Sequence, residues 1–87
     1  MEKLFEANIH TPYKTVFQGR VSMINAPGKA GYFGILADHA PFISTLMPGK
    51  VAYRDAAGKV TIIDSKKDGF LEVLNNKVTV LLDSVEI

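Results

Sequence analysis

The chain has 87 residues, a length that suits a single domain spanning residues 1–87. Its hydrophobic fraction of 47% is too high for a disordered chain, and the lack of cysteine excludes a disulfide framework and zinc-finger spacing. The 10 Lys and Arg residues are interspersed with 9 Asp and Glu residues, for a net charge of +1. A nucleic-acid partner is therefore not expected, because nucleic-acid binders usually carry a basic stripe that releases counterions from phosphates.

Direct membrane insertion is not expected either. No apolar run approaches the roughly 20 residues that span a bilayer. The N-terminus lacks the basic and apolar regions of a signal peptide. We expect a soluble, cytosol-facing chain that associates with a membrane only through a partner protein.

The first half of the chain carries strand patterns broken by turn residues. Apolar and polar residues alternate over residues 5–10, which predicts a half-buried strand. Pro12 ends this strand, because proline has no N–H to donate to a ladder. A longer stretch over Thr15–Ala26 is expected to form one bent strand or two, because Gly19 in its middle predicts a bulge. Pro27–Gly31 is expected to be a loop, since proline fixes φ and glycine supplies positive φ.

The second half continues in the same way. Pro48-Gly49 predicts a type I or II turn, and Gly58 is expected in the left-handed region of a hairpin loop. Asn75-Asn76 predicts a tight primed turn, because asparagine tolerates positive φ. The regularly spaced strands and turns indicate an all-β fold of the sandwich or barrel type. Further strands are expected at residues 33–36, 42–47, 51–54, 60–63, 70–74 and 78–82.

Asp38-His39, followed by Ser44, brings together the residue types of a hydrolytic site. A nucleophilic triad needs the carboxylate to orient the imidazole beside the hydroxyl. Adjacent side chains of an extended segment point to opposite faces, and no Gly-x-Ser-x-Gly elbow is present. We therefore expect no catalytic residue and interpret His39 as a loop or partner contact. A hydrolase that uses His39 is kept as an alternative.

Neither a metal site nor a phosphate-binding loop is expected. His10 and His39 are the only histidines, so a zinc site would need carboxylates from scattered strands. The segment 27–31 lacks the Gly-Lys-Ser/Thr ending of a phosphate loop, and no helix is expected after it. Its bare backbone allows a partner to approach closely, which favours a docking surface.

The aromatic residues allow two interpretations. Most are expected in the core, because aromatic side chains supply much of the core area of a small β domain. Tyr32 and Phe33 are consecutive and follow a glycine loop, so at least one should face solvent or a partner. The alternative is a small OB-like or sandwich module that stacks the bases of an oligonucleotide. The other aromatic residues considered are Tyr13, Phe17, Phe42, Tyr53 and Phe70.

An ordered set of short motifs covers nearly the whole chain and resembles the N-terminal domain of the epsilon subunit of F-type ATP synthases, which is called delta in mitochondria. The first motifs are Phe17-Gln18-Gly19-Arg20-Val21, Gly31-Tyr32-Phe33-Gly34-Ile35-Leu36, His39-Ala40-Pro41, Thr45-Leu46 and Pro48-Gly49. The last are Gly69-Phe70-Leu71-Glu72-Val73 and Asn76-Lys77-Val78-Thr79-Val80-Leu81-Leu82-Asp83.

The resemblance implies a β-sandwich of two packed, mainly antiparallel sheets with a non-catalytic role. In that family the domain lies at the foot of the central stalk, between the gamma subunit and the membrane c-ring. It turns with them as a rotor that couples proton flow to ATP synthesis, and it meets the catalytic head only indirectly. The resemblance implies no metal and no cofactor. The implied location is peripheral, on the cytoplasmic face of a bacterial plasma membrane or an equivalent energy-transducing membrane.

Candidate contacts with the gamma subunit or the c-ring follow from the matching segments. Residues 26–34 match the segment that contacts the ring in the family, and residues 38–42 match a neighbouring stalk-facing surface. Tyr32 is the expected anchor, because it follows the loop glycine. The candidate residues are Gly28, Lys29, Ala30, Gly31, Tyr32, Phe33, Asp38, His39 and Pro41.

The chain departs from the family in two places. Relatives commonly have proline where this chain has Ala37, which relaxes φ and predicts a different or looser turn. Relatives usually continue into two C-terminal helices that inhibit ATP hydrolysis and in some members bind ATP, whereas this sequence ends at Ile87. Neither the helical hairpin nor its inhibition is therefore expected of this chain.

Overall fold

The computed structural model describes residues 2–86, which form nine strands and contain no helix. The strands are β1 (Phe5–His10), β2 (Thr15–Gly28), β3 (Gly31–Ile35), β4 (Phe42–Leu46), β5 (Gly49–Asp55), β6 (Val60–Ser65), β7 (Gly69–Leu74), β8 (Lys77–Leu82) and β9 (Val85–Glu86).

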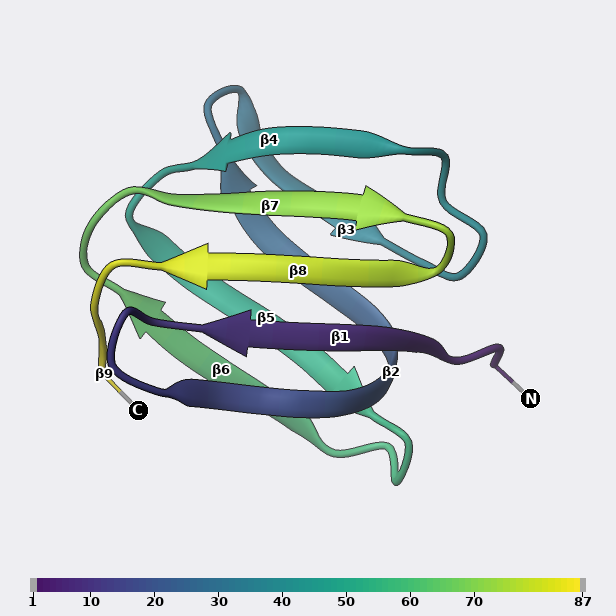
Figure 1. Ribbon diagram of the computed structural model, residues 1–87. Helices are drawn as coiled ribbons and strands as arrows, with labels where there is room; N and C mark the ends of the chain where they lie inside the picture. The colour runs from purple at the N-terminus through teal and green to yellow at the C-terminus, as the bar shows by residue number, and fades with distance from the viewer. Residues whose placement is uncertain (1, 87) are drawn as a thin grey trace.

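These strands form one continuous hydrogen-bonded sheet that folds over itself. The order is β4-β7-β8-β1-β2-β5-β6-β9, and β3 pairs with β2 beside this path. Figure 1 shows two layers, with β4, β7, β8 and β1 in front and β3, β5 and β6 crossing behind them. Among the described strand pairs only β1 and β8 are parallel. The predicted all-β sandwich with mainly antiparallel pairing is confirmed.

The strand β2 belongs to both layers. It pairs with β1 up to Val21, with β5 over residues 21–25 and with β3 over residues 24–28. The register against β5 shifts between Val21 and Met23, which makes Ser22 the extra residue of a bulge. Because a bulge bends a strand and increases its twist, one strand of 14 residues can pass from the front layer to the back (Figure 1).

The bulge predicted at Gly19 is wrong, since Gly19 pairs in regular register with Ala7. Glycine at position 19 instead leaves space for the side chain of Phe17. A Cβ at Gly19 would lie 3.0 Å from the Cζ atom of Phe17. The Phe17 ring packs against Tyr53 of β5 with ring centroids 4.2 Å apart. Glycine at this position therefore allows an aromatic contact between the two layers.

The core lies between the layers and follows the two-residue period of the strands. In β7 and β8, buried and more exposed side chains alternate along each strand. The buried apolar residues are Phe5, Ala7, Ile9, Val21, Ile24, Ala26, Ile35, Leu46, Val51, Tyr53, Ile63, Leu71, Val73, Val78, Val80 and Leu82.

The turn predictions have mixed outcomes. Asn75 and Asn76 have φ values of 51° and 59°, and Gly58 has a φ of 87°, as predicted. Pro48 forms a bend, but Gly49 already begins β5. The loop predicted over residues 27–31 is wrong, because β2 and β3 extend into it as a hairpin.

Most of the aromatic residues are expected in the core, but Tyr13 and Phe70 lie outside it. Tyr13 is 91% exposed, because it lies in the turn between β1 and β2 rather than on a strand. Phe70 is 40% exposed, because it points outward in the alternation of β7.

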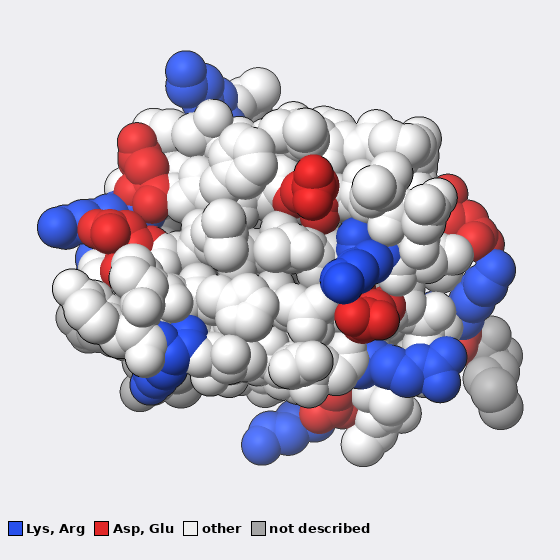
Figure 2. All heavy atoms as spheres, viewed as in Figure 1, with Lys and Arg blue, Asp and Glu red and all other residues white. Residues whose placement is uncertain are grey.

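The outer face of the front layer is largely uncharged. Figure 2 shows a pale surface over much of this face, interrupted by an acidic side chain near its middle and by charged side chains toward both ends. Ile43, Phe70, Leu74 and Leu81 expose apolar area here. Phe70 and Leu81 are directly paired across β7 and β8, which places their side chains on one face. The front layer thus exposes apolar side chains on its outer face, alongside the charged residues Glu6, Glu72 and Lys77.

Replacing a core residue on β7 should destabilise the protein far more than replacing its outward-facing neighbour. Leu71 is 0% exposed, and Leu71→Ala should lower the free energy of unfolding by about 2–5 kcal/mol, because it leaves a cavity. Leu74 is 50% exposed, and Leu74→Ala should change that free energy by only about 0.5 kcal/mol. Urea denaturation measures both. Equal losses would contradict the assignment of inner and outer faces.

Candidate functional site

The candidate residues 28–33 form a tight hairpin between β2 and β3. Gly28 pairs with Gly31, so only Lys29 and Ala30 lie in the turn. Gly31 has a φ of 130°, a conformation that glycine adopts without a steric penalty. Both turn residues and Gly31 are exposed. The hairpin therefore presents a short exposed tip, in which Gly28 and Gly31 flank the side chains of Lys29 and Ala30.

Two hydrogen bonds tie this hairpin to the segment that leads into β5. The N–H of Met47 donates to the carbonyl of Pro27 at 2.8 Å, and the N–H of Lys50 donates to the hydroxyl of Tyr32 at 3.0 Å. The N–H and C=O of a strand residue point to the same side of the strand, and the Pro27 carbonyl points to Met47 rather than to β3. Proline at this position therefore costs no hydrogen bond between β2 and β3. A Cβ at Gly49 would lie 2.7 Å from the Tyr32 hydroxyl, so glycine permits the close approach. The hairpin is therefore anchored near its tip.

The consecutive aromatic residues of this hairpin face opposite sides, so one of them is exposed, in line with the prediction that at least one faces solvent or a partner. Tyr32 is 56% exposed. Phe33 packs against the core and meets Phe42 edge-on, with ring centroids 5.3 Å apart. Successive side chains of a strand alternate between faces, which accounts for the difference.

Asp38 lies in the loop between β3 and β4, with a φ of 65°. Its backbone N–H donates to Oδ1 of Asn76 at 2.6 Å, and Nδ2 of Asn76 donates to the Asp38 carboxylate at 2.9 Å. Nζ of Lys3 donates to both carboxylate oxygens, at 3.0 and 2.9 Å. The Asn76 hydrogen bond, and then Lys3, hold the pKa of the Asp38 carboxyl below its ordinary value.

His39 is positioned by its own loop and by an aromatic neighbour. Its Nδ1 donates to the carbonyl of Ala40 at 2.7 Å, and its ring centroid lies 5.5 Å from that of Phe42. The Ser44 hydroxyl donates to the carbonyl of Thr45 at 2.9 Å. The Asp38 carboxylate bonds to Asn76 and Lys3, as described above. These side chains therefore do not form a Ser-His-Asp arrangement.

The structure does not bring all the candidate residues into one cluster. The hairpin tip at Lys29-Ala30 and the loop containing Asp38, His39 and Pro41 lie at opposite ends of β3 (Figure 1). The rings of Phe33, Phe42 and His39 connect the two parts by successive edge contacts. The candidate residues thus form two separate surfaces joined through packed aromatic rings.

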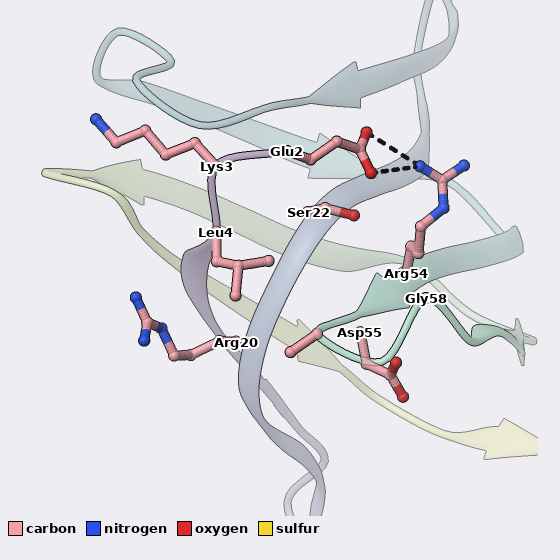
Figure 3. A pocket seen from close by; sticks show the side chains of 9 residues that line it. Glu2, Lys3, Leu4, Arg20, Ser22, Arg54, Asp55 and Gly58 are labelled. Atoms are coloured by element: carbon pink, nitrogen blue, oxygen red, sulfur yellow. Dashed lines mark hydrogen bonds and ion pairs between the residues drawn. The ribbon is translucent and has the colours of Figure 1, made fainter.

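A cavity of about 500 Å³ lies between the N-terminal segment, the strand β2 and the end of β5. Figure 3 shows the Glu2 carboxylate facing the guanidinium of Arg54, and Nη1 of Arg54 donates to both of its oxygens at 3.1 and 3.2 Å. The Ser22 hydroxyl is buried and has no hydrogen-bond partner among the described residues. Other lining residues are Lys3, Leu4, Arg20, Asp55, Ala56 and Gly58. The basic groups of Arg54 and Lys3 are thus already paired with carboxylates, Arg54 with Glu2 and Lys3 with Asp38.

Sequence reasoning missed the partners that hold the candidate loops. The local sequence pattern predicts a turn at Asn76, but it predicts no contact for Lys3 and no partner for the Tyr32 hydroxyl. The Asn75-Asn76 pair was the one available signal, because two asparagines supply more polar groups than a turn needs. Its partner Asp38 is 38 positions away in sequence, which a local pattern does not reveal.

Charge is distributed in opposite-sign pairs. Within residues 2–86, ion pairs join Lys3 to Asp38, Lys50 to Asp64, Arg54 to Glu2, Lys67 to Asp83 and Lys77 to Glu6. In the same range no group of three or more His, Cys, Asp or Glu side chains is placed to hold a metal ion. The described chain also has no helix long and apolar enough to cross a membrane.

The strands and the two anchored loops define a small β-sandwich domain with exposed loops on a packed scaffold. Residues 4–87 match the family described as ATP synthase, Delta/Epsilon chain, beta-sandwich domain. The chain therefore belongs to this family, and the predicted resemblance is confirmed.

Two curated relatives are named ATP synthase epsilon chain. That of Desulfosudis oleivorans is 40% identical over 86 residues, covering 99% of this chain and 64% of the relative. That of Nitratidesulfovibrio vulgaris strain Miyazaki F is 45% identical over 86 residues, covering 99% and 63%. The chain thus spans somewhat less than two thirds of these relatives' length.

Two solved structures share the fold. A chain of the Euglena gracilis mitochondrial ATP synthase matches 95% of this chain and 52% of its own, with a TM-score of 0.88 and 20% identity. A chain of the central stalk and c-ring of the Tetrahymena thermophila mitochondrial ATP synthase matches 98% and 67%, with a TM-score of 0.79 and 20% identity.

Removing the Tyr32 hydroxyl should loosen the hairpin. Tyr32→Phe deletes the acceptor for the Lys50 N–H and should lower the free energy of unfolding by about 0.5 kcal/mol, the low end for a hydrogen bond at an exposed residue. The amide resonance of Lys50 should shift. Tyr13→Phe is the matched control, because Tyr13 is 91% exposed. Urea denaturation and amide NMR measure the effects. Identical spectra and stabilities in the two variants would contradict the bond.

The Asp38 carboxyl should titrate below its ordinary pKa of 3.8 in a carbon-detected NMR experiment. Because its native pKa lies below its unfolded pKa, the charged form stabilises the fold above the unfolded pKa, and that contribution is lost as pH falls through the native pKa. Asn76→Gly should raise the pKa of Asp38 by removing the largest cause, and Asn75→Gly should leave it unchanged. Equal pKa values in wild type and Asn76→Gly would contradict the geometry.

Proposed function

We propose that this chain is a non-catalytic central-stalk subunit of a proton-translocating F-type ATP synthase. The observation that carries the proposal is the match of residues 4–87 to the ATP synthase delta/epsilon β-sandwich family. The curated relatives are named as epsilon chains of that enzyme. In this role residues 1–87 act as one domain, join the gamma subunit to the membrane c-ring and perform no bond chemistry.

The mechanism is mechanical coupling. Proton flow turns the ring, the stalk turns with it, and the gamma subunit drives ATP formation in the catalytic head. A component of such a rotor must transmit torque without deforming or slipping. The continuous sheet, the two-residue turns and the buried core suit this requirement, because densely packed interiors have low compressibility and transmit strain.

The hairpin of residues 28–33 is proposed to contact the c-ring or the gamma subunit. Its tip is exposed, yet it is anchored through Pro27 and Tyr32 to the segment entering β5. A surface already held in its binding conformation loses less entropy on association. Tyr32 combines an exposed ring with a fixed hydroxyl, which suits an interface anchor.

The loop containing Asp38, His39 and Pro41 is proposed as a second contact with the stalk. It lies at the other end of β3, so one domain offers two separate surfaces to its partners. This arrangement suits a component that must hold two neighbours at once. The chain is proposed to reside peripherally at an energy-transducing membrane, on the cytoplasmic side in a bacterium, and to be held there by these partners.

A binding experiment tests the proposal. The tagged chain should bind the purified gamma subunit or the detergent-solubilised c-ring from the same organism. Tyr32→Ala should weaken this binding by about tenfold or more, as expected for a central aromatic anchor. Tyr13→Ala is the control, because Tyr13 is exposed but is not a candidate contact. Isothermal calorimetry measures both variants.

The proposal would be contradicted if the folded wild-type chain bound neither partner. Salt-dependent binding to single-stranded oligonucleotides in the same assay would favour the base-stacking module instead. Equal affinities of the Tyr32→Ala and Tyr13→Ala variants would remove Tyr32 from the interface.

A further inference from the structure

Three segments far apart in sequence meet at Asp38. They are the loop between β3 and β4, the turn between β7 and β8, and the N-terminal segment before β1. Asn76 provides both polar atoms of its side chain: Oδ1 accepts from the backbone of Asp38 at 2.6 Å, and Nδ2 donates to its carboxylate at 2.9 Å. Lys3, which precedes β1 at the same end of the sheet, forms an ion pair with the same carboxylate at 2.9 Å. The Asn76 amide thereby exchanges two hydrogen bonds with Asp38, one with its backbone N–H and one with its carboxylate.

The turn itself does not need this asparagine side chain. Asn75 and Asn76 both have positive φ, which glycine would adopt equally well. The backbone carbonyl of Asn76 accepts from the N–H of Glu6 at 2.9 Å, and any residue would provide that bond. What is particular to Asn76 is the side-chain pairing across to the loop. Within the described residues the Asn75 side chain has no hydrogen-bond partner.

The loop needs an external restraint. Asp38 has a φ of 65°, a left-handed conformation that residues other than glycine adopt uncommonly and that aspartate tolerates better than most; the contacts around Asp38 hold it in this conformation. Its neighbour Ala37 does not fix φ as a proline would. Beyond Asp38, the loop is held by the contact between His39 and Phe42. Asn76 is thus placed to keep the first half of the loop in one conformation.

We propose that Asn76, assisted by Lys3, is the positioning residue that holds Asp38 in place and thereby fixes the surface formed by His39 and Pro41 for docking. This inference rests on the proposed function, in which that loop contacts the stalk. It adds the β7–β8 turn to the docking machinery as a support that touches no partner itself.

The experiment compares two turn variants in the full chain. Asn76→Gly keeps a residue suited to positive φ and removes the pairing with Asp38. Asn75→Gly makes the same change one position earlier, where no pairing is lost, and serves as the matched control. Backbone order parameters from ¹⁵N relaxation are measured for residues 37–40, and the melting temperature is measured for both variants.

Asn76→Gly should lower these order parameters from about 0.85, typical of rigid backbone, to below about 0.6. Asn75→Gly should leave them unchanged at a similar melting temperature. The double variant Asp38→Asn with Asn76→Asp should restore order, because an asparagine amide then donates to a carboxylate in the reverse direction. Asn76→Asp alone should not restore these order parameters, because the carboxylates of Asp38 and of the new residue repel each other.

Binding of the same variants to the gamma subunit and the c-ring completes the test. Asn76→Gly should weaken binding by about tenfold relative to Asn75→Gly, the effect of losing hydrogen bonds of ordinary net strength. Unchanged order parameters would overturn the inference and leave the proposed function intact. A loosened loop with unchanged affinity would overturn the docking role of Asn76. A wild-type chain that binds neither partner would overturn the proposed function, and the docking role with it.

Discussion

The fold depends on the long strand β2 and on its passage from one layer to the other. Val21 and Ile24 are fully buried on either side of the bulge at Ser22, so the strand contributes to the core before and after it bends. Because β1 pairs with its first part and β3 and β5 with its second, the two layers share one strand rather than meeting as separate sheets. Sliding of one layer over the other would break this hydrogen-bonded continuity.

The same strand sets the position of the candidate surfaces. Where β2 ends at Gly28, the hairpin tip begins, and β3 then carries the chain to the opposite end of the sandwich, where Asp38 lies. The two loops are therefore separated by the length of one strand while resting on one scaffold. Each is fixed by a contact distant in sequence, from Lys50 to Tyr32 and from Asn76 to Asp38. Such anchoring suits the proposed role between two partners that turn together.

The sequence predicted the strands and the Asn75-Asn76 turn because these depend on local alternation and on residues that tolerate positive φ. It misplaced the bulge, because Gly19 signals backbone freedom whereas its role is to leave space for the Phe17 ring. It also took Pro27 as the start of an open loop, although the carbonyl of Pro27 is bonded outside the hairpin. The Phe17 ring packs on Tyr53, and the Pro27 carbonyl accepts from Met47. These partners are distant in sequence, so local patterns do not contain them.

The most direct measurement of the central claim is site-specific photo-crosslinking in membranes of the source organism. The chain has no cysteine, so Ala30→Cys at the hairpin tip gives a single attachment point for a photoreactive maleimide. Lys59→Cys, in the turn between β5 and β6, is the control position. The account predicts light-dependent crosslinks from position 30 to the gamma subunit or to a c subunit, identified by mass spectrometry, and markedly fewer from position 59. Crosslinks from position 30 to neither subunit, in an assembled and active enzyme, would contradict it.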